Sequence, residues 1–215
     1  IITAFVGLVM GLINGFIVTR FNVHSIIVTL GTLSLYRGLV FIVSGGRQID
    51  RNDIPEHVVS FSQTSSLFSI PGILIFSAII VVITHLVMRH SVLGREIYAT
   101  GSNPVAAHLK GINVTKVTLF CFGICGMLAG VAGLMISTQA TLSPQMGGDP
   151  LLKAFVICVV AGLGNVWGAG LCAFGLAIFE ATIGFYIGVR FGFPAMLLLV
   201  VAVLVWRPQG LFGQE

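Results

Sequence analysis

Three polar side chains stand inside long apolar stretches of the sequence: those of Asn14, Arg37 and Glu180. A charged group in hydrocarbon is costly unless a partner or water accompanies it. Counted from the same side of a membrane, Arg37 and Glu180 both lie about 20 Å along their helices, at roughly 1.5 Å per residue. This shared depth predicts that they pair or flank one polar path, with structural pairing the simpler interpretation. The Asn14 amide either joins two helices or lines such a path.

The sequence lacks the motifs of the common nucleotide-dependent and intramembrane enzymes. It contains neither G-x-x-x-x-G-K-[ST] nor H-E-x-x-H. Ser44 lacks the glycine two positions earlier that an intramembrane serine protease would have, and residues 146–149 miss the G-x-G-D pattern of membrane aspartyl proteases by one residue. We therefore expect no enzyme, no ATP site within the chain, no catalytic residues, no metal and no cofactor.

The composition restricts the class of protein. Of the 215 residues, 56% are hydrophobic and 8% are charged, and the mean hydropathy is +1.05. Soluble domains carry about 25% charged residues, so this chain has too few charges to cover a surface that faces water. We therefore exclude a soluble domain and expect a polytopic membrane protein. The net charge of +4 comes from a few basic residues near the ends of apolar runs. Lipid headgroups and membrane orientation explain them, so nucleic acid is not an expected partner.

The four cysteines all fall inside apolar runs: Cys121, Cys125, Cys158 and Cys172. The first two share a helix face at a spacing of four, yet no histidine or carboxylate lies near them in sequence. We expect all four to be buried small hydrophobic residues rather than metal ligands.

Apolar runs bounded by charged or turn-forming residues predict an all-α transmembrane bundle of about seven membrane segments. The expected segments cover residues 1–20, 24–44, 71–88, 116–138, 151–163, 166–187 and the stretch after 194 to 206. The fifth is shorter than the roughly 20 residues needed to cross a membrane, and GLGNVWG (162–168) interrupts it. Such broken helices line solute paths in transporters, and a tilted hairpin without that role is the alternative.

Glycines recur every four residues in two of the expected spans. Gly7, Gly11 and Gly15 form a stripe along the first span, and Gly126 and Gly130 repeat the spacing in the fourth. Close backbone approach drives helix association in lipid, so the stripe predicts a tightly packed helix pair.

Basic residues on short connections set the expected orientation. Arg20, the basic segment 89–116 and Arg207 belong on the cytoplasmic side, whereas the charge-balanced loop 45–69 belongs on the other. Residue 1 then falls outside. Because the chain opens with Ile-Ile-Thr in apolar sequence, without an initiator Met, we expect the first residues of a longer protein to be missing. An odd number of missing spans would place the true N-terminus in the cytoplasm.

One polar segment, LGREIYATGSNPVAAHLKGI (93–112), stands out in this apolar chain. Ser102 or Asn103 can cap a helix, Pro104 suits its first position and Gly111 can end it in the left-handed conformation. The segment therefore predicts a helix of about two turns between two spans. Such a helix can dock a soluble partner or simply rest on lipid headgroups, and these residues leave both open.

Several of these runs resemble known permeases. TLGTLSLYRG (29–38) and GREIYATGSNPVAAHLKGINV (94–114) are similar to the permease subunits of ribose-type sugar ABC importers, including those for the autoinducer-2 sugar signal. The run from Lys153 through GLGNVWGA, with Glu180 and the ending WRPQGLFG, is more similar to branched-chain amino-acid permeases. Both belong to one superfamily, and the resemblance covers essentially the whole chain.

The resemblance implies a single permease domain over residues 1–215, with about three spans missing before it, in a bacterial cytoplasmic (inner) membrane. It also implies a second permease copy, either identical or a paralogue, two cytoplasmic ABC ATPase subunits and a periplasmic or lipid-tethered solute-binding protein. By this likeness the segment 93–112 is a coupling segment that docks on the ATPase. Its corresponding residues are Gly94, Arg95, Asn103, Pro104, Ala106, Ala107 and Gly111.

The function expected from this resemblance is ATP-driven import of a small polar solute by alternating access. A sugar of the ribose or autoinducer-2 type is favoured, because the segments 29–38 and 94–114 match that branch more closely. The C-terminal half keeps a branched-chain amino acid as the alternative. A passive pore or a non-transporting membrane scaffold is the alternative from another class, and uptake that persists after ATPase inactivation would indicate the pore.

Overall fold

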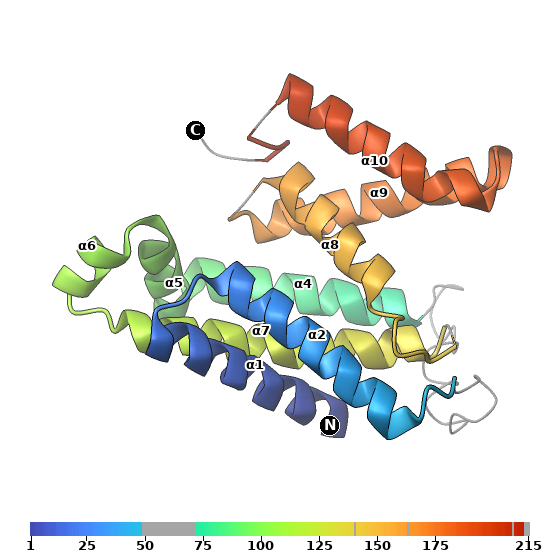
Figure 1. Cartoon of the computed structure of the whole chain (residues 1–215). Coiled ribbons are helices and arrows are strands. Elements are labelled where there is room, and N and C mark those ends of the chain that lie inside the picture. The colour runs from blue at the N-terminus through green and yellow to red at the C-terminus, as the bar shows by residue number, and fades with distance from the viewer. Residues whose placement is uncertain (49–71, 140, 163, 208, 213–215) are drawn as a thin grey trace. The chain divides into compact units, whose positions relative to one another are not determined.

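The structure is a computed structural model of the chain, and it describes residues 1–48, 72–139, 141–162, 164–207 and 209–212. In these ranges the regular elements are helices, as the all-α prediction requires (Figure 1). They are α1 (Ile2–Phe21), α2 (Ser25–Ser44), α4 (Gly72–His90), α5 (Val92–Ser102), α6 (Pro104–Leu109), α7 (Val114–Ser137), α8 (Gly148–Ala161), α9 (Val166–Tyr186) and α10 (Val189–Trp206).

Within the described ranges, six helices are long and apolar enough to cross a membrane: α1, α2, α4, α7, α9 and α10. The seventh apolar segment, α8, has 14 residues and is shorter than the roughly 20 that a crossing requires. The prediction of a polytopic bundle with one short segment is therefore confirmed.

Two boundaries differ from the sequence-based expectation. The last span begins at Val189, so Pro194 lies inside α10 rather than before it. Proline in a helix removes one backbone donor, but neighbouring helices and local adjustments make this tolerable in membrane segments. A separate helix, α5, precedes the short helix that the sequence predicted. The predicted loop 45–69 and Pro71 lie largely outside the described residues; Gly45 and Gly46, which follow α2, are left-handed, with φ of 58° and 72°.

The helices form two compact units. The first comprises residues 1–76 and 87–147, and the second comprises residues 77–86 and 148–215. The helix α4 therefore contributes residues to both.

In the first unit, α1 packs along α7 through the predicted glycines (Figure 1). A Cβ atom on Gly7 or Gly11 would overlap the carbonyl oxygen of Gly126 or Phe122, respectively, and one on Gly15 would lie 2.9 Å from the Cβ of Phe122. The two helix backbones are thus in direct contact, which only glycine allows. The expectation of a tightly packed helix pair is confirmed, and the partner of the stripe is α7.

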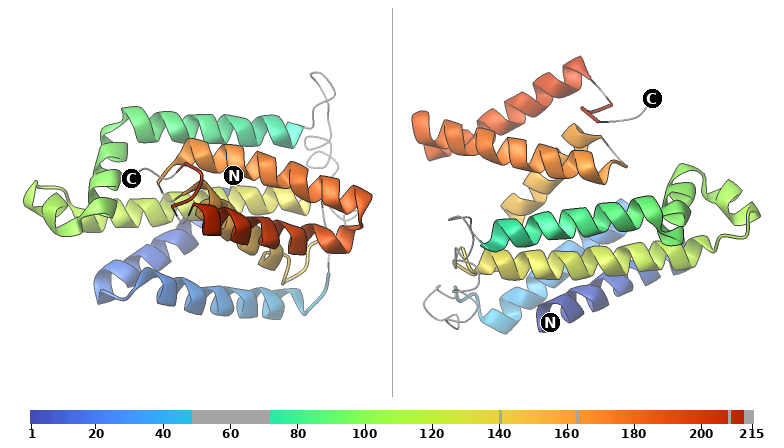
Figure 2. Two further views of the ribbon diagram at one scale, coloured as in Figure 1. Left: turned by 90° about the horizontal axis from the view of Figure 1, so that it is seen from above. Right: turned by 180° about the vertical axis from the view of Figure 1, so that it is seen from behind.

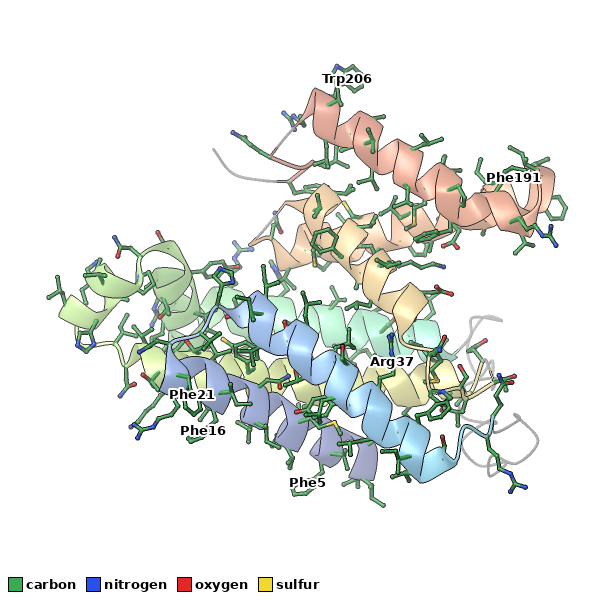
Figure 3. The ribbon with its side chains drawn as sticks, viewed as in Figure 1. Phe5, Phe16, Phe21, Arg37, Phe191 and Trp206 are labelled. Carbon is green, nitrogen blue, oxygen red and sulfur yellow. The ribbon has the colours of Figure 1, made fainter. Side chains whose placement is uncertain are left out.

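Large apolar side chains cover the outside of the helices. Phe5 and Phe16 extend outward from α1, and Trp206 extends from the end of α10 (Figure 3). The Phe5 side chain is 65% exposed and that of Trp206 is 92% exposed. Exposed aromatic residues on apolar helices are typical of a surface that faces lipid.

In the second unit, α8, α9 and α10 pack around an apolar core (Figure 2). Its buried members are Val156, Val160, Ala161, Cys172, Leu176, Met196 and Val200. This core fixes the short helix α8 against two full-length spans.

Candidate functional site

The predicted coupling segment begins at a sharp elbow between α4 and α5. The Ser91 hydroxyl donates a hydrogen bond to the carbonyl oxygen of Val87 at 2.6 Å and accepts one from the Gly94 amide at 2.9 Å. A Cβ on Gly94 would overlap the carbonyl group of Met88. The elbow therefore requires glycine at this position and fixes the direction of α5 relative to the end of α4.

The short helix α6 is capped as the sequence predicted. The Asn103 Oδ1 accepts hydrogen bonds from the amides of Val105 and Ala106, both at 3.0 Å, and Pro104 is the first helical residue. Gly111 follows the helix in the left-handed conformation, with φ of 83°. Local capping thus defines both ends of α6.

One exposed face of α6 is apolar. Val105 is 71% exposed and Leu109 is 83% exposed, and at a spacing of four they lie on the same face of the helix. In Figure 1, α6 lies beyond the ends of α1 and α7. Ala106 is exposed as well, whereas Ala107 is buried, with 2% of its surface exposed. The two alanines therefore differ: Ala106 lies on the surface, and Ala107 packs α6 against the rest of the chain.

The seven predicted coupling residues lie on α5, α6 and the turns beside them. Gly94 is buried and shapes the elbow, and Arg95 next to it is exposed. Sequence reasoning missed Val105 and Leu109 as surface residues. The available signal was a pair of apolar residues, four apart, in a polar segment between two spans.

Asn14 is in contact with a neighbouring helix. The Tyr36 hydroxyl on α2 lies 3.3 Å from the Asn14 Oδ1 and 3.3 Å from the carbonyl oxygen of Met10, so it can donate to either. The bond links α1 to α2, which agrees with the interpretation of Asn14 as a residue that joins helices. Its role in a polar path stays a prediction.

Arg37 and Glu180 belong to different units. Arg37 extends from the middle of α2 and is exposed (Figure 3). The pairing of Arg37 with Glu180 therefore stays a prediction.

Glu180 has a partner that sequence reasoning did not find. The Lys153 Nζ on α8 lies 2.6 Å from the Glu180 Oε1 on α9, and the side chains are 37% and 27% exposed, respectively. On α10, Gly192 lies close to Glu180, because a Cβ there would be 3.2 Å from the Glu180 Cγ. The signal in the sequence was a single lysine in the apolar run LLKAFVICVVA.

The last described residues form hydrogen bonds with the backbone at the break between α8 and α9. The amides of Leu211 and Phe212 donate to the carbonyl oxygens of Val160 and Ala161 at 2.7 and 3.0 Å. These carbonyls belong to the last turn of α8 and have no partner within the helix. The predicted break is confirmed, and part of its backbone is satisfied by protein rather than by a water-filled cavity.

The start of α9 packs against the same segment. The Asn165 Oδ1 caps α9 by accepting from the Gly168 amide at 2.9 Å, and its Nδ2 donates to the Phe212 carbonyl at 3.4 Å. A Cβ on Gly168 would lie 2.8 Å from the Cβ of Phe212. Residues 209–212, which we call the tail, thus hold the end of α8 and the start of α9 together.

A ring contact joins α4 to α9 in the second unit. The ring centroids of His85 and Trp167 are 5.4 Å apart, with an angle of 48° between the planes. His85 lies in the part of α4 that belongs to the second unit, as Trp167 does.

Comparison with known proteins identifies the group of proteins. Residues 1–206 match the family model described as the permease component of the branched-chain amino acid transport system. The chain belongs to this permease family. The family is a transport component, and the multi-pass membrane architecture agrees with it.

Two similar relatives are named as autoinducer 2 import permeases. The chain is 34% identical, over 166 residues, to the autoinducer 2 import system permease protein LsrC of Yersinia pseudotuberculosis serotype O:1b. The aligned region covers 77% of this chain and 46% of the relative. It is also 34% identical over 183 residues to the protein of the same name from Yersinia enterocolitica serotype O:8, with 85% and 48% covered. The chain thus spans about half the length of the curated relatives it matches. No solved structure matches it.

The cysteines of this permease correct one expectation. Cys172 is buried, as predicted, but Cys125 and Cys158 are exposed and Cys121 is partly exposed. A span in lipid can present apolar residues outward, so apolar sequence around a cysteine does not imply burial within the chain.

Proposed function

We propose that this chain forms the membrane-spanning permease subunit of an ATP-driven importer in a bacterial cytoplasmic membrane. Its partners are cytoplasmic ABC ATPase subunits, a second permease copy, a solute-binding protein and the surrounding lipid. The family match over residues 1–206 and the similarity to import permeases support this assignment.

The observation that carries the proposal is the exposed apolar face of α6. Val105 and Leu109 are among the most exposed apolar residues of the polar segment 93–112. A rigid, capped helix with apolar side chains is suited to insertion into a groove on a soluble partner. We assign this groove to the ATPase, which would be the cytoplasmic source of movement.

Alternating access then follows a chain of contacts. Movement of α6 is passed through α5 to the Ser91–Gly94 elbow and from there to α4. The His85–Trp167 contact passes it to α9, which carries Glu180. Such coupling requires that the ATPase bind α6 differently in its two states, since a partner with equal affinity for both shifts nothing.

The proposed solute is a sugar of the ribose or autoinducer-2 type, because the relatives are named as autoinducer 2 import permeases. A branched-chain amino acid is the second candidate, and the description of the matching family supports it.

Charged residues on the exposed face of α6 test the docking role. In the double variant Val105→Glu/Leu109→Glu, we expect the ATPase to stop co-purifying with the permease and uptake to fall by at least about tenfold, because two desolvated carboxylates would lie in the interface. The amount of permease in the membrane should not change, because both side chains are exposed. Ala106→Glu should act in the same way.

The matched control is Val105→Ile/Leu109→Met, which keeps the face apolar and should retain both ATPase binding and uptake. Ala107→Glu is a folding control, since Ala107 is buried, and it should lower the amount of permease itself. Unchanged ATPase binding in the double glutamate variant would contradict the docking role. Uptake that continues with a catalytically inactive ATPase would indicate a passive pore. A wild-type permease that folds and binds the ATPase but shows no uptake would favour a scaffold.

A further inference from the structure

The Lys153–Glu180 ion pair lies well inside two antiparallel apolar helices. In α8, Lys153 is five residues after the first residue, Gly148; in α9, Glu180 is six residues before the last residue, Tyr186. At about 1.5 Å per residue, both groups are about 8–9 Å from the helix ends that lie on the same side. The 21 residues of α9 match the thickness of a hydrocarbon core, so the pair lies within it.

The two side chains are not sealed within their unit. With 37% and 27% of their surfaces exposed, Lys153 and Glu180 present charged groups at the surface of the α8–α9–α10 group. Hydrocarbon cannot cover a charged group cheaply, and ionisable residues in membrane segments face water-filled cavities or protein. The exposed side of the pair is therefore not a lipid-facing surface.

The pair also retains unused hydrogen-bonding capacity. An ammonium group has three donors and a carboxylate has about four acceptor positions. Within the described chain, the bond between the Lys153 Nζ and the Glu180 Oε1 is the one hydrogen bond that either head group makes. On the side of α10, Gly192 contributes no side chain that could occupy these positions.

We propose that the Lys153–Glu180 pair is a hydroxyl-binding site in the solute path, an inference that rests on the importer function proposed above. One hydroxyl of a polyhydroxylated solute donates to the Glu180 carboxylate, and its neighbour accepts from the Lys153 ammonium. The pair has no net charge and stays closed, so a neutral solute binds without separating the ions. Its free donors and acceptors lie side by side, which suits the neighbouring hydroxyls of a sugar-like ligand.

The test uses the complete importer in proteoliposomes, with the permease, its ATPase and its solute-binding protein. The probe is radiolabelled ribose or autoinducer 2, whichever the wild type accumulates, and uptake and ATP hydrolysis are measured in the same vesicles. For Glu180→Gln we expect uptake per ATP hydrolysed to fall about tenfold or more, as for a lost hydrogen bond to a charged group. ATP hydrolysis itself should remain near the wild-type rate. A purely structural defect would lower both.

The charge-swapped variant Lys153→Glu/Glu180→Lys separates binding from helix pairing. It keeps an ion pair but exchanges donors and acceptors with respect to the solute, so uptake per ATP should stay low. Full recovery in the swap, or no loss in Glu180→Gln, would overturn the hydroxyl site and leave the importer function intact. If the wild type accumulates neither ribose nor autoinducer 2, the proposed sugar transport is wrong, and the hydroxyl-binding site is wrong with it. This holds whether or not the vesicles take up leucine.

Discussion

The α1–α7 pair of the first unit and the α8–α9–α10 group of the second hold membrane helices together by opposite means. Along α1 and α7, glycines bring the two backbones into direct contact, and no charged side chain takes part in the contacts described. In the second unit, an ion pair, a helix break and the tail add polar bonds to an apolar core.

The difference indicates which part can change during transport. Backbone contact through glycines depends on exact shape and loses its dispersion energy when the helices separate. Polar bonds can be exchanged for bonds to water or solute at a small net change in free energy. We therefore expect α1 and α7 to move as one body, and the α8–α9 region to rearrange.

The largest effect is expected from a bulky residue in the α1–α7 contact. In Gly126→Leu, even the Cβ would overlap the Gly7 carbonyl and lie 2.8 Å from the Gly11 Cα, and a backbone cannot yield as a side chain does. We expect a destabilisation of about 3 kcal/mol or more, measured as the loss of folded permease in detergent during a thermal ramp.

The matched control for this substitution is on the same helix. A Cβ on Gly133 of α7 would have no atom within 4 Å, so Gly133→Leu should leave thermal stability close to that of the wild type. Equal stability of the two variants would show that the glycine contact is not what holds α1 to α7.

Local signals in the sequence were sufficient for α6 and for the spans. Capping by Asn103 and termination at Gly111 involve residues within one turn of the helix, so their types and spacing determine the outcome. The glycine stripe on α1 was also readable, but its partner was not, because spacing identifies a packing face and not the helix that it meets. The matching spacing of Gly126 and Gly130 was the available clue.

Contacts between distant segments were beyond such reasoning. Glu180 was matched with Arg37 because both were measured from the same side of the membrane. Lys153, 27 positions before Glu180, is a lone lysine in an apolar run, but such a residue does not identify the helix with which it pairs. The tail pairs backbone amides with Val160 and Ala161, and backbone bonds of this kind leave no trace in residue type.

An intermediate effect is expected where the tail meets α9. Gly168→Ala places a methyl group against the Phe212 side chain, and Phe212→Ala removes that side chain. Each single variant should lower thermal stability by about 1 kcal/mol. The double variant should cost less than the sum, because alanine at 212 removes the Phe212 Cγ and Cδ2 atoms, 2.9 and 3.0 Å from the new methyl group, and leaves only the Cβ contact at 2.8 Å. A thermal ramp on all four proteins measures this coupling.

The control for this cycle is Gly175→Ala, also on α9, where a Cβ would have no neighbour within 4 Å. It should be neutral or slightly stabilising, because alanine favours the helix. If the stability losses of Gly168→Ala and Phe212→Ala are strictly additive, the tail does not pack against the start of α9.

The smallest effect is expected at the polar bond between α1 and α2. In Tyr36→Phe, the loss of a single hydrogen bond between membrane helices should cost about 0.6 kcal/mol. Asn14→Leu should cost less, because the Tyr36 hydroxyl can still donate to the Met10 carbonyl. If Asn14 serves only to join helices, Asn14→Leu will reduce uptake no more than Tyr36→Phe does, at equal amounts of permease in the membrane. A larger loss of uptake in Asn14→Leu, without a larger loss of thermal stability, would instead place the Asn14 amide on the solute path. The first unit would then contribute to that path as well as to the rigid body.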